Sequence, residues 1–306
     1  MRRDIVILGI FVADVTFRTD RLPKLGETLL GHSFALGPGG KGSNQAVAAA
    51  RAGGAVHFLT RLGRDDFADI ARATWDRAGV IAHVIDDPES YTGSACIMVE
   101  EKSGDNAIIV AAGAAGRLCA ADADANASLI GGAAVFMTQL EQPLPAALRA
   151  LELARSGGAR TILNPAPAAR LPKNVLPLCD FVTPNEHEAA SLTGLPVTTN
   201  AEAERAAAAL LDLGAGAVLM TLGENGVFYH DGVRALHVPA FSAGKVVETT
   251  GAGDAFNGGF ATALAEGADA VEAVRFGCAV AGISVTRPGA AASMPTRAEV
   301  LALIGG

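Results

Sequence analysis

Short segments rich in β-branched residues alternate with alanine-rich segments along most of the 306-residue chain. β-Branched residues favour strands, and alanine favours helices. Strands joined by helices become neighbours in a parallel sheet, because a parallel pair needs a long crossover connection. The alternation therefore predicts an α/β fold: a doubly wound, mostly parallel sheet with helices on both faces, in one domain over residues 1–306.

The predicted elements continue this alternation through most of the chain. The predicted strands are Asp4–Gly9, Ala55–Thr60, Ala133–Thr138, Thr161–Leu163, Phe181–Thr183, Ala217–Thr221 and Lys245–Val247. The predicted helices are Ser43–Ala52, Phe67–Ala78, Pro145–Ser156, Glu186–Thr193, Glu202–Asp212 and Ala255–Ala265.

Two segments, at about 11–36 and 92–111, break the pattern. The first has alternating residues and turn signals but no helical period, and the second reads as two strands joined by Lys102–Asp105. Two interpretations stay open on the pattern alone. The segments pair into a small sheet that acts as a lid and keeps water from a reactive group, or they form two peripheral hairpins.

Composition excludes several classes of partner. Apolar residues make up 50% of the chain but aromatic residues only 5%, so the core is expected to consist mainly of Ala, Val, Leu and Ile. The net charge is -8 and no block of basic residues occurs, which argues against nucleic-acid and anionic-membrane partners. No apolar run approaches the roughly 20 residues of a membrane span. Met1–Asp4 leads into a strand rather than a secretory segment, so we expect a cytoplasmic protein.

The cysteines and histidines show no metal-ligand spacing. The four cysteines contain no CxxC pair, and we expect them to be reduced and mostly buried. The six histidines form no cluster and are interpreted as surface or hydrogen-bonded residues. The cysteines are Cys96, Cys119, Cys179 and Cys278.

A glycine-rich segment, Gly37–Asn44, precedes the first predicted helix. It formally matches the dinucleotide fingerprint GxGxxG, but it does not follow the first strand directly, and the next strand ends in Arg61 rather than in an acidic residue. It also fails as a P-loop, because Lys41 is followed by Gly42 instead of Ser or Thr. Lys41 and Asn44 are candidate hydroxyl-binding groups, and a tight polar loop is the alternative.

The most informative segment is Glu248–Gly259, which contains Gly251, Gly253 and Asp254 before a predicted helix. Glycines at a helix start let backbone N–H groups and the positive end of the helix dipole face an anion. A carboxylate among them can accept the proton of an alcohol while the N–H groups stabilise a transferring phosphoryl group. The alternative is that Asp254 only caps the helix.

Asn185 and Glu188 lie three residues apart at the start of another predicted helix, so both can occupy its first turn. Their oxygen atoms suit Mg²⁺, which retains waters and binds phosphate oxygens. A capping box explains the same pair, and the two interpretations are compatible. Thr221 and Gly223 follow a predicted strand and can approach a phosphate.

Taken in order, these motifs resemble the PfkB family of carbohydrate kinases, and its ribose-phosphorylating members most closely. The resemblance covers nearly the whole chain. It rests on Gly39–Ala50, Asn164–Ala168, Thr183–Glu186, Gly251–Gly258 and Val285–Ala290.

The resemblance implies a role for each matching residue. It implies that Asp254 is the catalytic base and that Gly251, Ala252 and Gly253 form an anion hole. The sugar-binding positions that it implies are Asp14, Gly40, Lys41, Asn44, Glu141 and Asp254. The nucleotide-binding positions that it implies are Asn185, Thr221, Gly223, Gly226, Gly253 and Cys278. The implied metal positions are Asn185 and Glu188 for Mg²⁺, and Glu248 and Thr250 for K⁺.

Three residues depart from the family pattern. Val12 stands where a sugar-binding Asn is usual, which predicts a less polar sugar edge. Glu248 stands where the monovalent-cation ligand is usually Asp, so the carboxylate is kept with one more methylene. Cys278 replaces a His near adenine.

The resemblance implies ATP-dependent phosphorylation of a sugar primary hydroxyl, with ribose as the leading substrate, ATP and Mg²⁺ required, and K⁺ as a further cofactor. It also implies a homodimer formed through the lid. Another sugar, a sugar acid or a nucleoside is the alternative substrate. The alternative of a different class is a sugar- or nucleotide-binding regulator without turnover, which the intact Asp254 and Lys41 disfavour. A dinucleotide-dependent oxidoreductase is weakened by the misplaced glycines.

Overall fold

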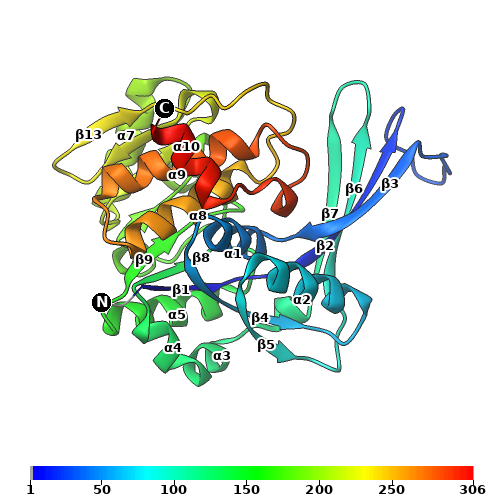
Figure 1. The fold of residues 1–306 in the computed structure, drawn as a ribbon, viewed down its shortest axis with the longest axis horizontal. Helices are drawn as coiled ribbons and strands as arrows, with labels where there is room; N and C mark the ends of the chain where they lie inside the picture. Colours follow the sequence, from blue (N-terminus) through cyan, green and yellow to red (C-terminus); the bar gives the residue numbers. More distant parts are fainter. Residues whose placement is uncertain (1–2, 306) are drawn as a thin grey trace.

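A nine-stranded sheet forms the centre of the computed structural model, which describes residues 3–305. Its strand order is β13-β12-β11-β10-β9-β8-β1-β4-β5. The strands from β11 through β5 pair in parallel, and β12 and β13 add an antiparallel edge. The predicted doubly wound, mostly parallel fold is confirmed (Figure 1). Met1 and Arg2, part of the predicted direct entry into the first strand, lie outside the described residues.

The elements have the following bounds. The strands are β1 Asp4–Leu8, β2 Val12–Thr19, β3 Ser33–Gly39, β4 Ala55–Leu62, β5 Ile81–Asp86, β6 Thr92–Glu100, β7 Asn106–Gly113, β8 Val135–Thr138, β9 Arg160–Leu163, β10 Phe181–Val182, β11 Val218–Thr221, β12 Val227–His230 and β13 Ala235–Val238. The helices are α1 Lys41–Arg51, α2 Asp66–Ala78, α3 Ala120–Ala125, α4 Ala127–Gly132, α5 Leu144–Ser156, α6 Glu186–Thr193, α7 Asn200–Asp212, α8 Ala252–Ala265, α9 Ala270–Ser284 and α10 Arg297–Gly305.

Helices cover both faces of the central sheet. Successive side chains of a strand point to opposite faces. Ile5 and Ile7 of β1 accordingly pack in one core cluster with residues of α1, α2, α8 and α9. Val6 and Leu8 pack in a second cluster with residues of α3 to α7. Alternate apolar residues of a strand are thus buried against helices on opposite faces of the central sheet.

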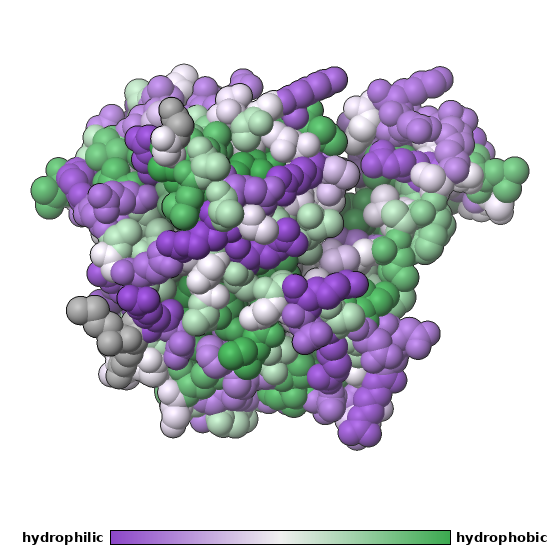
Figure 2. Space-filling view, in the orientation of Figure 1, coloured by the Kyte–Doolittle hydropathy of each residue, from purple (hydrophilic) through white to green (hydrophobic). Residues whose placement is uncertain are grey.

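A separate four-stranded sheet projects from this body, in the order β3-β2-β6-β7 (Figure 1). The two extended segments therefore pair with each other, as the lid interpretation expects, rather than forming isolated hairpins. β2 joins the two halves through a parallel pairing with β6. Hydrophobic and hydrophilic residues both lie on the surface of this sheet, as on the body (Figure 2), and its exposed large apolar residues include Phe34, Ile109 and Val110.

Helices α1 and α8 pack unusually close together. A Cβ atom on Gly258 of α8 would lie 2.5 Å from the Ala48 Cβ and 2.7 Å from the Ala49 backbone nitrogen of α1. Real Cβ atoms do not approach neighbours this closely, so only glycine fits at this crossing. The contact brings the glycine-rich start of α1 beside the glycine-rich start of α8.

One predicted strand is absent, and the helix that carries Asp254 begins earlier than predicted. Lys245–Val247 is not a strand: it lies in a connection in which Val246 and Val247 are more than half exposed. The Val247 N–H bonds the carbonyl of Val285, the C-cap residue of α9. β-Branched residues supply strand propensity, but here no neighbouring strand pairs with them. Helix α8 begins at Ala252 rather than at Ala255, so Asp254 lies in its first turn.

All four cysteines are free. Cys179 and Cys278 are buried, Cys96 is half-buried and Cys119 is exposed, so the expectation of mostly buried cysteines holds for two of them. Within residues 3–305, no helix combines the length and the apolar character that crossing a bilayer requires.

Candidate active site

Asp254 is a buried carboxylate held by the start of α1. Its Oδ2 accepts a hydrogen bond of 3.1 Å from the Asn44 side-chain amide, and its Oδ1 accepts one of 3.0 Å from Gln45. The helix N-cap is Gly251, with a φ of 79° that favours glycine, and no side chain caps this helix. The alternative that Asp254 only caps α8 is therefore wrong, and its carboxylate is available for chemistry.

A pocket of about 170 Å³ opens beside Asp254 at the carboxyl ends of β9, β10 and β11. Ligands of open parallel sheets bind at this edge, because the loops that follow the strands meet there. The lining residues are Lys41, Asn164, Ala166, Thr183, Asn185, Glu188, Thr221, Thr249, Gly251, Ala252, Gly253, Asp254 and Asn257.

The first turn of α8 offers backbone donors to this pocket. The first N–H groups of a helix have no partner within the helix. Here the Ala252 N–H bonds the Thr249 carbonyl, and the Ala255 N–H bonds the Gly251 carbonyl. Among the described residues, that leaves the N–H groups of Gly253 and Asp254 for an anion, aided by the helix dipole.

One lysine stands among four buried or half-buried carboxylates. Burial raises the pKa of Asp254, although Lys41 and the two amide hydrogen bonds oppose the shift. Burial and repulsion from Asp254 raise the pKa of Asp14 to about 6. Burial raises the pKa of Glu141 to about 7, against the attraction of Lys41. Burial also raises the pKa of Glu188. The pKa of Lys41 is raised because attraction to the carboxylates outweighs its own burial.

Asn185 and Glu188 form the capping box of α6. The Asn185 side chain accepts the Glu188 N–H at 2.8 Å, and Glu188 Oε2 accepts the Asn185 N–H at 2.9 Å. The capping interpretation is confirmed. The cap uses one carboxylate oxygen of Glu188, and both residues also line the pocket, so the cap aims them at a ligand of the pocket.

The structure brings most of the predicted site residues together. Lys41, Asn185, Glu188 and Thr221 line the pocket with the first turn of α8. Asn44 bonds Asp254 directly, Glu141 Oε2 accepts the Lys41 backbone N–H at 2.7 Å, and the pKa of Asp14 responds to Asp254. Gly40 makes the tight turn before α1, where its φ is 88°.

Five other predicted residues lie outside this pocket. Gly223 and Gly226 belong to the turn between β11 and β12. Cys278 is only 5% exposed and packs in the core on α9, where burial raises the pKa of its thiol to about 12. Glu248 accepts the Gly289 N–H at 3.0 Å and so ties its loop to the segment after α9. Thr250 follows it in the same loop, immediately before the N-cap.

Sequence reasoning missed five polar residues near Asp254: Gln45, Asn164, Thr183, Thr249 and Asn257. Gln45 bonds Asp254, and the other four line the pocket. Gln45 and Asn257 carried a readable signal, because a polar residue inside an alanine- or glycine-rich helix is expected to point to a partner. Nothing in the sequence indicated which partner.

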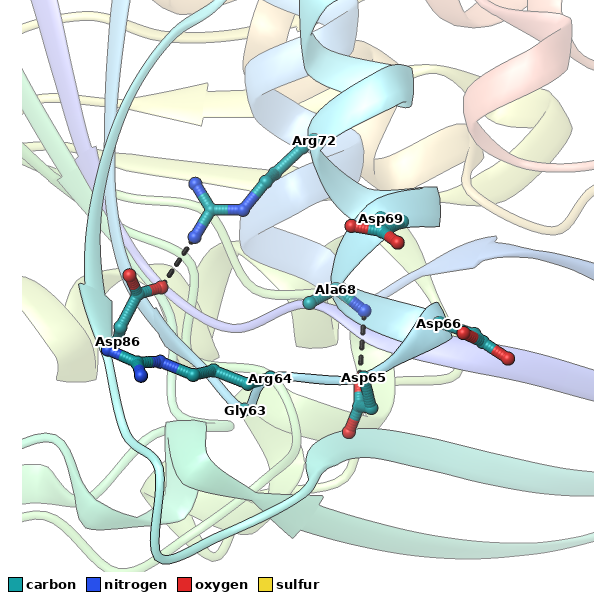
Figure 3. A pocket seen from close by; sticks show the side chains of 8 residues that line it. All are labelled: Gly63, Arg64, Asp65, Asp66, Ala68, Asp69, Arg72 and Asp86. Carbon is teal, nitrogen blue, oxygen red and sulfur yellow. Dashed lines mark hydrogen bonds and ion pairs between the residues drawn. The ribbon is translucent and has the colours of Figure 1, made fainter.

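A larger hollow, of about 570 Å³, lies beside the start of α2 (Figure 3). Its Arg72 side chain already pairs with Asp86 at 2.5 Å, and its Asp65 side chain accepts the Ala68 N–H at 2.9 Å. It shares no residue with the Asp254 pocket. We therefore place the chemistry in the smaller pocket, where a buried carboxylate, a lysine and helix N–H groups meet.

Comparisons with known proteins agree with this geometry. A family model described as pfkB family carbohydrate kinase matches residues 2–297. A ribokinase from Haemophilus influenzae is 39% identical over 302 residues, which cover 98% of each chain. A deoxyribokinase from Salmonella typhi is 37% identical over 295 residues, which cover 96% of each chain. A solved ribokinase from Arabidopsis thaliana, complexed with ribose and ATP, matches with a TM-score of 0.93 and 32% identity over all of both chains.

We expect Glu141→Gln to stabilise the protein relative to the wild type as pH rises from 5 to 8. The pKa of Glu141 rises from 4.5 to about 7 on folding. The stability that this shift contributes is therefore present below pH 4.5 and is lost as pH rises through 7. Gln cannot ionise and can still accept the Lys41 N–H. Urea unfolding at both pH values should show a relative gain of about 1–3 kcal/mol at pH 8.

The matched control is Glu204→Gln on the exposed side of α7, which also removes one negative charge. Its difference from the wild type should be the same at both pH values. An equal difference for Glu141→Gln at pH 5 and pH 8 would contradict the assignment of a buried, desolvated carboxylate.

Proposed function

The chain belongs to the pfkB family of carbohydrate kinases, and on that premise we propose that it transfers the γ-phosphoryl group of ATP to the primary hydroxyl of a pentose, with D-ribose as the first substrate to test. The observation that carries this proposal is the buried Asp254 carboxylate in the first turn of α8, beside Lys41 and two N–H groups that have no helical partner. The full-length similarity to ribokinases supports it.

The proposed reaction is an in-line displacement. The sugar hydroxyl oxygen forms a bond to the γ-phosphorus, the bond to the ADP oxygen breaks, and the hydroxyl proton passes to Asp254. The N–H groups of Gly253 and Asp254, together with the Lys41 ammonium, stabilise the negative charge on the phosphoryl oxygens. Asp14, Asn44 and Glu141 hold the sugar, and Thr221 and the turn at Gly223 approach the nucleotide phosphates.

Asn185 and Glu188 suit a Mg²⁺ ion that arrives with ATP. Glu188 lines the pocket, and the capping box uses only its Oε2. No cluster of three or more His, Cys, Asp or Glu side chains suited to a metal occurs in residues 3–305. A site of few protein ligands fits Mg²⁺, which keeps waters and binds phosphate oxygens. When bound, the ion neutralises charge on the nucleotide phosphates.

We propose Glu248 and Thr250 as the ligands of a K⁺ ion. Support comes from the bond of Glu248 to the Gly289 N–H, which places its carboxylate between two loops next to the start of α8. Turnover assays with K⁺ and with a large organic cation test this proposal, and equal rates would reject it. A kinase also needs a supply of ATP, which supports a cytoplasmic location.

A 2-deoxypentose is the second candidate substrate, and Val12 is the observation that favours it. Val12 and Asp14 lie two residues apart on β2, so they face the same side of the lid. Val12 is 4% exposed and packs with Ile10, Ala95 and Ala115. A sugar hydroxyl facing this apolar wall would lack a partner, at a cost of about 1–3 kcal/mol. The similarity to a deoxyribokinase supports this reading.

The four-stranded sheet is proposed to close over the sugar as a lid and to bind a second copy of this chain. Its exposed large apolar residues are Phe17, Phe34, Leu36, Ile108, Ile109 and Val110. From the strand register, Ile108 and Val110 share the face of Asp14, whereas Phe17, Phe34, Leu36 and Ile109 share the opposite face. Exposed apolar surface of this extent marks an interaction site.

Asp254→Asn should lower kcat by about 100-fold or more, because general-base catalysis contributes on that scale. Sugar affinity, measured by calorimetry, should change little, because the amide keeps the shape and one acceptor of the carboxylate. Asp269→Asn, at the N-cap of α9, is the control and should leave kcat unchanged. If Asp254→Asn turned over at the wild-type rate, Asp254 would not be the base. A wild type that phosphorylates no sugar or nucleoside would favour a regulator.

Val12→Asn should raise the ratio of kcat/KM for D-ribose to kcat/KM for 2-deoxy-D-ribose by about 10-fold. A new polar partner for the extra hydroxyl is worth about 1–3 kcal/mol. Val15→Asn makes the same change on the opposite face of β2 and should leave the ratio unchanged. An unchanged ratio in Val12→Asn would show that Val12 does not face the sugar hydroxyls.

Light scattering should give the wild type a mass twice that of one chain. Ile108→Asp and Ile109→Asp introduce the same charge on opposite faces of β7, so the variant that dissociates the dimer identifies the face that is used. A monomeric wild type, or a dimer that survives both changes, would contradict dimerisation through this sheet.

A further inference from the structure

A chain of buried amide side chains runs beneath the Asp254 pocket. Gln139, which follows β8, donates from Nε2 to the Gln45 Oε1 at 2.6 Å. Gln45 Nε2 donates to Asp254 Oδ1 at 3.0 Å and to Asn164 Oδ1 at 3.1 Å. Gln45 and Gln139 are both fully buried. The chain therefore connects the central sheet, α1 and the proposed base without solvent between them.

Gln45 has every hydrogen-bonding group in use. A glutamine amide has two N–H donors and one carbonyl acceptor. The two donors serve Asp254 and Asn164, and the carbonyl accepts from Gln139. Turning the amide over would place its oxygen against two acceptors and its nitrogen against a donor. The partners thus hold the Gln45 amide in the one orientation that donates to Asp254.

A second branch of the network holds the helix turn that carries Asp254. Asn164 Nδ2 donates to the Thr183 carbonyl at 2.9 Å. Thr183 Oγ1 donates to Asn257 Oδ1 at 2.7 Å, and Asn257 Nδ2 donates to the Gly253 carbonyl at 2.8 Å. The side chain of the base and the backbone beside it are therefore tied to the same buried groups.

We propose that Gln45 is a positioning residue for the kinase reaction: it holds Asp254 Oδ1 in place, so that Oδ2 is the oxygen that receives the hydroxyl proton. The proposal rests on the proposed function. Oδ2 accepts only from Asn44, whose own Oδ1 is buried and has no partner in residues 3–305. Asn44 lies at the sugar-binding start of α1, so a bound sugar competes for its amide and frees Oδ2. Gln45 lies deeper and stays bonded to Oδ1.

The charged groups around Asp254 make its pKa sensitive to the hydrogen bond from Gln45. Lys41 of α1 favours the carboxylate, whereas burial opposes it. Asp14 of β2, Glu141 after β8 and Glu188 of α6 add negative charge nearby. A donated hydrogen bond lowers the pKa of a buried carboxylate, because it stabilises the charged form. Loss of the Gln45 donor should therefore leave less of Asp254 ionised at neutral pH.

The test is the pH dependence of kcat in Gln45→Met, which keeps a side chain of similar length without the amide. We expect the acid limb of the profile to move up by about one pH unit. Near pH 7, kcat should fall by roughly 10-fold and recover towards the wild type at higher pH, and KM for the pentose should stay within about twofold. An unmoved acid limb, or a loss of kcat that is the same at every pH, would overturn the proposal.

Ser43→Ala is the matched control. Ser43 is also fully buried on α1, and its hydroxyl accepts the Trp75 indole N–H at 2.9 Å, with no contact to Asp254. This variant should lose stability and keep the wild-type pH profile. A shift equal to that of Gln45→Met would trace the effect to a general disturbance of α1 and would also overturn the proposal.

Gln139→Met is the second variant, for the case in which Gln45→Met does not fold. It leaves Gln45 in place but removes the donor that orients its amide. We expect a smaller shift of the acid limb in the same direction, and no shift would reject the positioning role. Turnover by the wild-type protein, measured in the same series, distinguishes the proposed function from the role of Gln45. No turnover by the wild type would reject the proposed function, whereas wild-type turnover with unshifted pH profiles in the variants would reject only the role of Gln45.

Discussion

The close contact between α1 and α8 is the constraint on which the rest of the site depends. Asn44 and Gln45 lie 210 and 209 residues before Asp254 in the chain, and both bond its carboxylate. They meet because Gly258 lets the backbones of the two helices approach to a distance that any Cβ would prevent. A wider crossing would move the start of α1, with its proposed sugar-binding residues, away from Asp254. The glycines of α8 thus serve packing at Gly258 and, in the proposed reaction, anion binding at Gly253.

The site also places several carboxylates where water cannot stabilise them. Asp14, Glu141, Glu188 and Asp254 all have raised pKa values with burial as the first cause, and attraction to Lys41 opposes the rise in pKa for Glu141, Glu188 and Asp254. The fold is less stable when they are ionised, whereas the proposed reaction needs Asp254 ionised. Hydrogen bonds from backbone and amide groups reduce this conflict. Such a conflict is typical of a site shaped for a ligand, because a bound ligand can supply further donors.

The small sheet connects substrate choice to assembly. Its strand β2 carries Val12 and Asp14, whose pKa responds to Asp254, and its strands β2, β3 and β7 carry exposed apolar residues. One face carries Asp14 and is the proposed sugar side, and the other includes Phe17 against Phe34, with ring centroids 5.3 Å apart. The same strands would thus close the site and bind a partner chain, so a change in the lid would affect both.

The sequence by itself determined the fold class, because the strand–helix alternation and the periodicity of the apolar residues are local properties of the chain. It also indicated Asp254, Lys41 and the Asn185–Glu188 pair, since helix starts rich in glycine or capping residues can be read from short segments. It did not determine that Lys245–Val247 stays unpaired, because a strand exists only where a neighbour offers hydrogen bonds. The partners of Gln45 were likewise decided by tertiary structure alone. A buried amide at a given position can bond whichever groups the packing of α1, α8 and the central sheet brings within hydrogen-bonding distance, and those groups come from segments far apart in the chain.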